Sequence, residues 1–175
     1  QALDEDGDPL RYVLQYSCDG GSTWSPIATN LSAKAFTVEL GTLAGCEEAR
    51  LRVLASDGVN TAFYDSDAPF SVEGKPPEPA IGSPRAGSVF SAVATVVLEG
   101  SATDLEDGPL TDDAAFHWSS HRQGDLGAGR ILMVDRLRSG YHTITLHVTD
   151  SDLYTGETSV SIFIGEQLQL PLLLK

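Results

Sequence analysis

The chain has 175 residues, 41% of them hydrophobic, and its 25 acidic and 11 basic side chains give a net charge of −14. This length fits one large or two small domains, and the apolar content is enough for a packed core, which argues against global disorder. The negative charge repels phosphates and anionic surfaces, which argues against nucleic acid and membranes as partners. No apolar run approaches the roughly 20 residues of a membrane-spanning helix.

The first half contains three segments in which apolar and polar side chains alternate. A period of two is typical of half-buried antiparallel strands, which point one face to the core and the other to water. The apolar faces carry Tyr12, Leu14 and Tyr16 in 11–17, Phe36, Val38 and Leu40 in 35–40, and Leu51 and Val53 in 49–55.

A proline-rich segment divides the chain. Pro76, Pro77 and Pro79 cannot continue a central strand, and they favour an extended, semi-rigid connection. We therefore expect a first domain at 1–74, a linker at 75–79, a second domain at 80–165 and an apolar tail at 166–175. Both halves of the chain are acidic. Residues 1–79 contain 5 basic and 13 acidic residues, a net charge of −8, and residues 80–175 contain 6 basic and 12 acidic residues, a net charge of −6.

The second half also has the pattern of strands, and no window of helical length carries a comparable 3.6-residue stripe. Short strands separated by Gly and Asp turns favour β-sandwiches. The sequence therefore predicts an all-β chain of two tandem β-sandwiches. The predicted strands of the second half are 93–98, 131–134, 142–149 and 158–164.

The first half resembles a fibronectin type III-like domain. The resemblance rests on 12–17 as strand C and on Leu43 with 50–58 (RLRVLASDG) as the E–F corner and strand F. The tyrosine that such domains carry before strand F is matched here by Ala49, so its hydrogen bond should be missing. Strands A and B have no counterpart before Gln1. The resemblance therefore implies a domain without its N-terminal strands, in a fragment of a longer protein.

The second half resembles the Ig-like and PKD-like modules of large bacterial exported proteins. The matching residues are 83–84 (SP) with Gly87, 98–108 (LEGSATDLEDG), 118–120 (WSS), 124–127 (GDLG), 140–145 (GYHTIT) and 148–150 (VTD). PKD domains proper carry Gly-Asp-Gly after the tryptophan strand, where this chain has Ser119-Ser120-His121, so "Ig-like" describes it better. Such modules imply adhesion, spacing or ligand presentation beside another domain, without catalysis.

A disulfide between Cys18 and Cys46 follows from the fibronectin-like layout. In that layout the turn after strand C and the E–F corner lie at the same end of the sandwich, and export permits disulfides. Two small buried thiols are the alternative.

The segment 17–24 (SCDGGSTW) fits the pattern S-x-D-x-G-x-T-W, which resembles the Asp-box of sialidase propellers. Such a box is a hairpin in which Asp19 caps the turn, Gly21 takes positive φ and Trp24 packs below. Glycoside hydrolysis needs a placed acid and nucleophile that the sequence does not offer, so we interpret this single copy as structural. Trp24 and Trp118 are predicted to anchor the cores, with sugar stacking as the alternative.

Two acidic turns are candidate calcium sites. Carboxylates at alternate positions around a Gly turn are how oxygen-ligand calcium sites are built. The alternative is that Asp and Gly are good turn formers. The first candidate set is Asp4, Asp6 and Asp8, and the second is Asp104, Glu106 and Asp107.

The four histidines do not predict a zinc site. They lie in the second half without a nearby cysteine, and zinc needs three or four convergent ligands. We interpret the four as side chains that either find hydrogen-bond partners within the fold or are exposed to solvent: His117, His121, His142 and His147.

The predicted function is a non-catalytic spacer, adhesion or presentation region of a larger secreted or cell-surface bacterial protein. Its partners would be other domains of that protein, with a cell-surface protein or a carbohydrate as further possibilities. Two alternatives stay open: an accessory C-terminal region of a secreted hydrolase such as a peptidase, and a carbohydrate- or protein-binding module.

A first domain without two strands would leave one apolar face in water. Tyr12, Leu14, Phe36 and Val53 would then need a cover. The candidates are the second domain, a second copy of the chain, or the tail 168–174, whose five Leu and one Pro are costly to leave in water.

Overall fold

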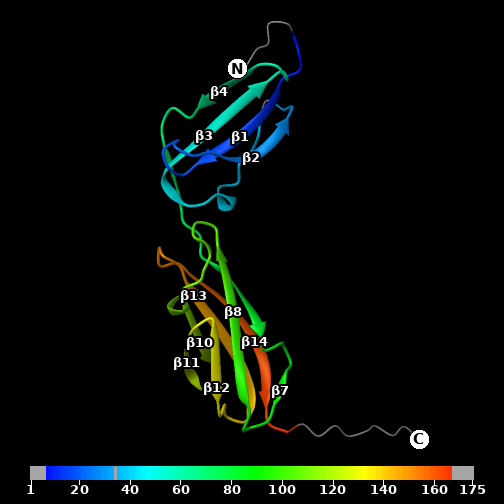
Figure 1. The fold of residues 1–175 in the computed structure, drawn as a ribbon, viewed down its shortest axis with the longest axis vertical. Helices are drawn as coiled ribbons and strands as arrows, with labels where there is room; N and C mark the ends of the chain where they lie inside the picture. The colour runs from blue at the N-terminus through cyan, green and yellow to red at the C-terminus, as the bar shows by residue number, and fades with distance from the viewer. Residues whose placement is uncertain (1–6, 34, 167–175) are drawn as a thin grey trace, which may run out of the picture. The chain divides into compact units, whose positions relative to one another are not determined.

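The computed structural model describes residues 7–33 and 35–166. The chain forms two compact units, Gln1–Lys75 and Pro76–Lys175, each described here by itself (Figure 1). The described residues form fourteen strands and two short 3₁₀ turns, Leu40–Thr42 and Asp113–Ala115. This confirms the all-β prediction.

The first unit is built on one antiparallel sheet with the order β2-β1-β3-β4, and β5 pairs with β3. Leu14 lies opposite Val53 and Tyr16 opposite Leu51, so the apolar sets of β1 and β3 share one face. Among the described residues this is the unit's single sheet, and its order is that of the C′-C-F-G sheet of an immunoglobulin-like sandwich. Its strands are β1 (Arg11–Ser17), β2 (Ser25–Leu31), β3 (Cys46–Ser56), β4 (Thr61–Asp65) and β5 (Phe70–Val72).

The segment 35–40 forms no strand, so the predicted strand there is wrong. Its last residue, Leu40, begins a 3₁₀ turn. Its alternation has another cause. Val38 packs against the small core of Tyr16, Leu43, Ala49 and Val72 without joining a ladder. The segment thus covers part of the sheet face, and Leu14, for which a cover from outside the first domain was expected, is only 8% exposed.

The second unit is a two-sheet sandwich with an immunoglobulin-like strand order. One sheet has the order β11-β10-β13-β14-β7, and the other has β12-β8-β6 with β9 on β8. Strand β7 runs parallel to β14, while the other pairs are antiparallel. The strands are β6 (Glu78–Ser83), β7 (Val89–Phe90), β8 (Thr95–Asp104), β9 (Gly108–Pro109), β10 (Phe116–Ser120), β11 (Gly124–Ala128), β12 (Ile131–Asp135), β13 (Gly140–Thr149) and β14 (Thr155–Ile164).

The core of the second unit is filled by inward side chains from both sheets. Trp118 and Phe116 of β10 are fully buried beside Leu98 of β8 and Leu146 of β13. Gly100 permits this packing, because a Cβ there would lie 2.6 Å from Leu146 Cδ2. Buried residues alternate with more exposed ones along β13, as the sequence predicts, and buried and exposed residues alternate strictly along β8.

In each unit the chain enters at one end of the sheet and leaves at the other. In the first unit, Arg11 pairs with Ser56, whereas Val72 pairs with Cys46, at opposite ends of the eleven-residue strand β3. An extended strand of that length spans about 35 Å.

The second unit repeats this path. Pro77 lies at the start of β14, where a Cβ on Gly156 would be 1.9 Å from the Pro77 carbonyl oxygen. The other end of β14 is marked by Gly165, whose N–H donates to the Phe90 carbonyl. Ten residues of strand, about 33 Å, separate the two ends. Because β6 starts at Glu78, the last two residues of the predicted linker 75–79 lie in this unit's first strand.

Candidate functional site

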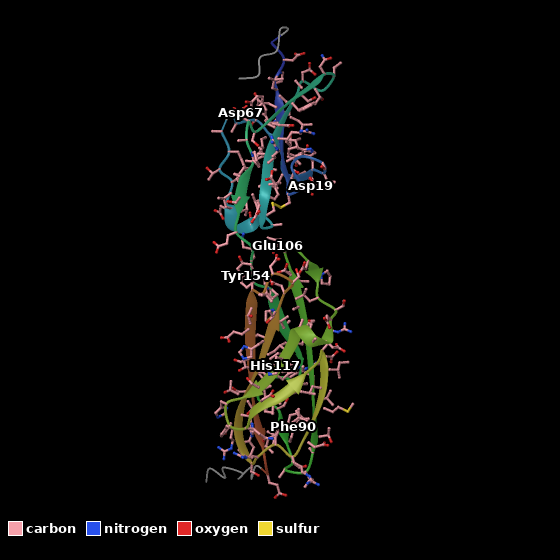
Figure 2. The ribbon with its side chains drawn as sticks, turned by 90° about the vertical axis from the view of Figure 1, so that its left-hand side faces the viewer. Asp19, Asp67, Phe90, Glu106, His117 and Tyr154 are labelled. Atoms are coloured by element: carbon pink, nitrogen blue, oxygen red, sulfur yellow. A yellow bond between two sulfur atoms is a disulfide. The ribbon has the colours of Figure 1, made fainter. Side chains whose placement is uncertain are left out.

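The turn at 17–24, in which Figure 2 labels Asp19, is held by hydrogen bonds to that side chain. Asp19 Oδ1 accepts hydrogen bonds from the Ser17 hydroxyl (2.7 Å) and the Thr23 N–H (2.8 Å), and Oδ2 accepts from the Thr23 hydroxyl (2.6 Å). Gly21 has a φ of 100°, and its carbonyl accepts from Trp24 Nε1 at 2.9 Å. Both carboxylate oxygens of Asp19 thus accept hydrogen bonds from within the turn and hold it together.

Trp24 lies outside the core. The Arg52 guanidinium sits 4.1 Å from the centroid of the Trp24 ring and 4.4 Å from that of Phe63. The same guanidinium donates two hydrogen bonds to Asp65, at 2.6 and 2.9 Å. Trp24 is half-buried and absent from the core cluster, so the core role predicted for it is wrong, whereas Trp118 is a core residue.

A disulfide joins Cys18, which follows β1, to Cys46, which begins β3, with the two Cα atoms 5.6 Å apart. Tyr16 lies beside it: its hydroxyl is 3.3 Å from Cys46 Sγ and donates to the Ala44 carbonyl at 2.7 Å. Ala49 is fully buried where a fibronectin-like domain carries its corner tyrosine. Tyr16 on the neighbouring strand therefore supplies a tyrosine-to-backbone bond to the segment before β3.

The acidic turn after β8 uses its carboxylates for hydrogen bonds within the loops. Asp104 Oδ1 accepts from the N–H groups of Glu106 and Asp107, and Asp107 accepts from the N–H and hydroxyl of Ser151. Asp104 Oδ2 is buried with no hydrogen-bond partner among the described residues.

Calcium binding by these turns stays a prediction. Within 7–33 and 35–166, no three His, Cys, Asp or Glu side chains are grouped as a metal ion would require. Asp8 of the first candidate set is exposed, and Asp4 and Asp6 lie outside the described residues.

The histidines are dispersed. His117 Nε2 lies 3.0 Å from Asp125 Oδ1, and His147 Nδ1 lies 3.4 Å from Glu157 Oε2. His121 accepts a hydrogen bond from the Thr143 N–H. His142 is buried between the Arg138 carbonyl, to which Nε2 donates (2.6 Å), and the Ser120 hydroxyl, 2.7 Å from Nδ1.

The sequence did not predict two of these contacts, those of Arg52 and of His142. Alternation alone places Arg52 on the polar face, but its stacking partner belongs to a distant turn. For His142, an inward position in a strand whose other inward residues are apolar was a signal that it needed polar partners.

An apolar groove lies on the sheet face of the first unit. Its volume is about 700 Å³, and it lies between β1, β3, β4 and the segment 31–38. The part of the chain that the structure describes contains no membrane-spanning helix.

The chain matches no protein-family model and no curated protein sequence. Among solved structures it is similar to the fibronectin(III)-like modules of CbhA from Clostridium thermocellum, with 14% identity over 53% of this chain and 100% of that chain and a TM-score of 0.40. It is also similar to the chicken interferon gamma receptor alpha chain, with 10% identity, coverage of 95% and 90%, and a TM-score of 0.40. The N-terminal Ig1-2 module of the Drosophila receptor protein tyrosine phosphatase DLAR has 11% identity, coverage of 89% and 84%, and a TM-score of 0.37. All three scores are below 0.5, so the fold assignment rests on strand order and register.

Acid should weaken the turn at Asp19. Hydrogen bonds from the Thr23 hydroxyl, the Thr23 N–H and the Ser17 hydroxyl, in that order of importance, hold the pKa of Asp19 far below its ordinary value of 3.8. A folded-state pKa below the unfolded one stabilises the fold above pH 3.8, and this contribution is lost as the pH falls.

The test compares the first unit's urea midpoint in the wild type and in Asp19→Asn. We expect the wild type to be the more stable at neutral pH, with the difference shrinking as the pH falls below 3.8. A difference that is constant with pH would contradict the assigned role of this carboxylate.

Proposed function

We propose that the chain is a non-catalytic spacer region of a larger exported protein, in which two all-β units hold neighbouring domains apart. The observation that carries this proposal is the path of the chain. Each unit receives the chain at one end of its longest strands and releases it at the other, so every unit adds its own strand length to the separation. A unit with both ends on one side would add almost none.

The disulfide supports the exported location. Cys18 and Cys46 are both oxidised in the first unit, and such bonds persist in secreted or periplasmic compartments. The net charge of −14 is also suited to a soluble extracellular spacer, since it opposes self-adhesion along most of the surface.

The length of each unit tests the proposal. Donor and acceptor dyes would be placed at the ends of one unit, on Pro9 and Glu73 or on Pro76 and Glu166, which are mostly exposed terminal positions. We expect energy transfer in each pair to report a separation of about 30 Å or more, constant between low and high salt. A separation below about 20 Å in either unit would mean that the unit does not extend the chain, and the spacer function would fail.

A further inference from the structure

Three arginines of the second unit lie on two loops at one end of its sheets. The loop after β10 contains Arg122, and the loop between β12 and β13 contains Arg136 and Arg138. These loops hold three of the six Lys and Arg of the unit, and they contain no Asp or Glu. All three arginines are exposed, and none has a carboxylate within ion-pair distance among the described residues. We call these three residues the arginine patch.

A buried polar pair holds the two loops together. Ser120 and His142 are 3% and 1% exposed, and Ser120 Oγ lies 2.7 Å from His142 Nδ1. Each also binds the backbone of one arginine: Ser120 Oγ accepts from the Arg122 N–H at 3.2 Å, and His142 Nε2 donates to the Arg138 carbonyl at 2.6 Å. Gln123 Oε1 accepts from the Arg138 N–H at 3.1 Å. A satisfied buried network fixes one geometry, and here it fixes the backbone beside two arginines.

Further contacts keep the arginine side chains in solvent. Leu137 is 3% exposed and belongs to the core, so it anchors the loop between Arg136 and Arg138. Arg136 has a φ of 56°, a left-handed backbone that non-glycine residues rarely adopt. Arg122 lies against Gly140, where a Cβ would be 3.2 Å from Arg122 Cζ. The patch is thus set by core packing and by contacts between the loops.

The acidic residues that flank the two loops have other partners. Asp125 Oδ1 lies 3.0 Å from His117 Nε2, and Asp135 Oδ1 accepts from the Thr95 hydroxyl. Guanidinium groups pair with carboxylates through two parallel hydrogen bonds. A partner that brings carboxylates therefore matches the chemistry that the patch lacks.

Charge favours a short acidic segment over a long polyanion. Exposed charges more than about 8 Å apart are largely screened at physiological salt, so a partner responds to the charges next to it. A long polyanion would extend from the patch onto the rest of the unit, where acid is in excess: residues 76–175 contain 13 acidic and 6 basic residues. A short peptide segment contacts the arginines alone.

We propose that the arginine patch of the second unit is a docking site for a short acidic segment of another protein. Asp or Glu carboxylates of that segment accept hydrogen bonds from the guanidinium groups of Arg122, Arg136 and Arg138. Exposed ion pairs contribute little one by one, so the affinity comes from the three together and falls with salt. This contact adds to the spacer function and does not depend on it.

Fluorescence anisotropy of a labelled hexaglutamate peptide, titrated with the full chain, tests the proposal. We expect saturable binding at about 20 mM salt that weakens at least about fivefold at about 150 mM salt, because salt screens the attraction. A labelled hexaglutamine peptide, which has the same length without the charge, should not bind.

Arginine-to-glutamine variants locate the contact. Arg122→Gln, Arg136→Gln and Arg138→Gln should each weaken hexaglutamate binding about threefold to fivefold, and the triple variant should weaken it more than about tenfold. Arg85→Gln is the matched control, since it removes the same charge from an exposed arginine outside the two loops. Its effect should stay below about twofold.

The proposal is overturned if hexaglutamate does not bind at either salt concentration, or if Arg85→Gln loses as much affinity as the patch variants. Heparin is the probe for a long polyanion. If heparin binds the full chain more tightly than hexaglutamate and loses affinity in the same variants, the partner is a polysaccharide and the proposal is wrong. Circular dichroism checks that the triple variant keeps its strand content, and if it does not, the three single variants decide.

Discussion

Replacing Cys18 and Cys46 together with alanine is expected to lower the free energy of unfolding of the first unit by about 3–4 kcal/mol. The disulfide closes a loop with a sequence separation of 28 residues, and the chain-entropy model assigns this stabilisation to a loop of that size. The unit has a small core of four buried side chains with partly buried neighbours, so such a loss is large against its stability.

Urea unfolding of the whole chain measures this effect. The chain has two tryptophans, Trp24 in the first unit and Trp118 in the second, so a Trp118→Phe background leaves fluorescence that reports the first unit alone. The Trp24→Phe background is the control, because the second unit contains no cysteine and should keep its midpoint. An unchanged midpoint in the first unit would mean that the crosslink does not support the fold.

The second large effect is expected from Trp118→Ala, which should destabilise the second unit by about 3–5 kcal/mol. Trp118 is fully buried between the sheets, and its Nε1 donates to the Gly129 carbonyl at 2.8 Å. The substitution leaves a cavity and a buried carbonyl without its donor. Differential scanning calorimetry would follow both units at once.

Two variants separate the causes of that loss. Trp118→Phe keeps most of the packing and removes the hydrogen bond, so it should cost less than Trp118→Ala. Trp24→Ala is the matched control, because this half-buried ring contacts Arg52 on the sheet surface and its loss should cost about 1 kcal/mol in the first unit alone. Equal losses for the two alanine variants would contradict the different positions of the two rings.

The sequence predicted the strands well where burial alternates strictly. In β13, Ile144, Leu146 and Val148 point inward as their spacing indicates. This strand lies between two sheet neighbours, so one of its faces is buried in the core and the other is more exposed to solvent. The segment 35–40 has the same alternation, but in the described structure it finds no partner for its backbone. Periodicity reports which side chains are buried and cannot report whether a hydrogen-bonded neighbour exists.

The candidate site was less predictable because its contacts join distant residues. The resemblance to fibronectin-like domains led to the Cys18–Cys46 pair, since it supplied the relative positions of two turns. Nothing in the sequence links Trp24 to Arg52, or Ser120 to His142, since each contact depends on sheet register. The acidic turn after β8 was interpreted from composition, and its hydrogen bonds to Ser151 came only from the fold.

The central claim is that two independently folded units pass the chain, and any tension on it, from end to end. Single-molecule pulling on residues 7 and 166 tests this most directly. The claim predicts two separate unfolding steps. Under oxidising conditions the first unit should release a contour length shorter by the 28-residue loop, about 100 Å, than it does after reduction, while the second unit should be unaffected. A single cooperative step, or equal contour lengths with and without reductant, would contradict the claim.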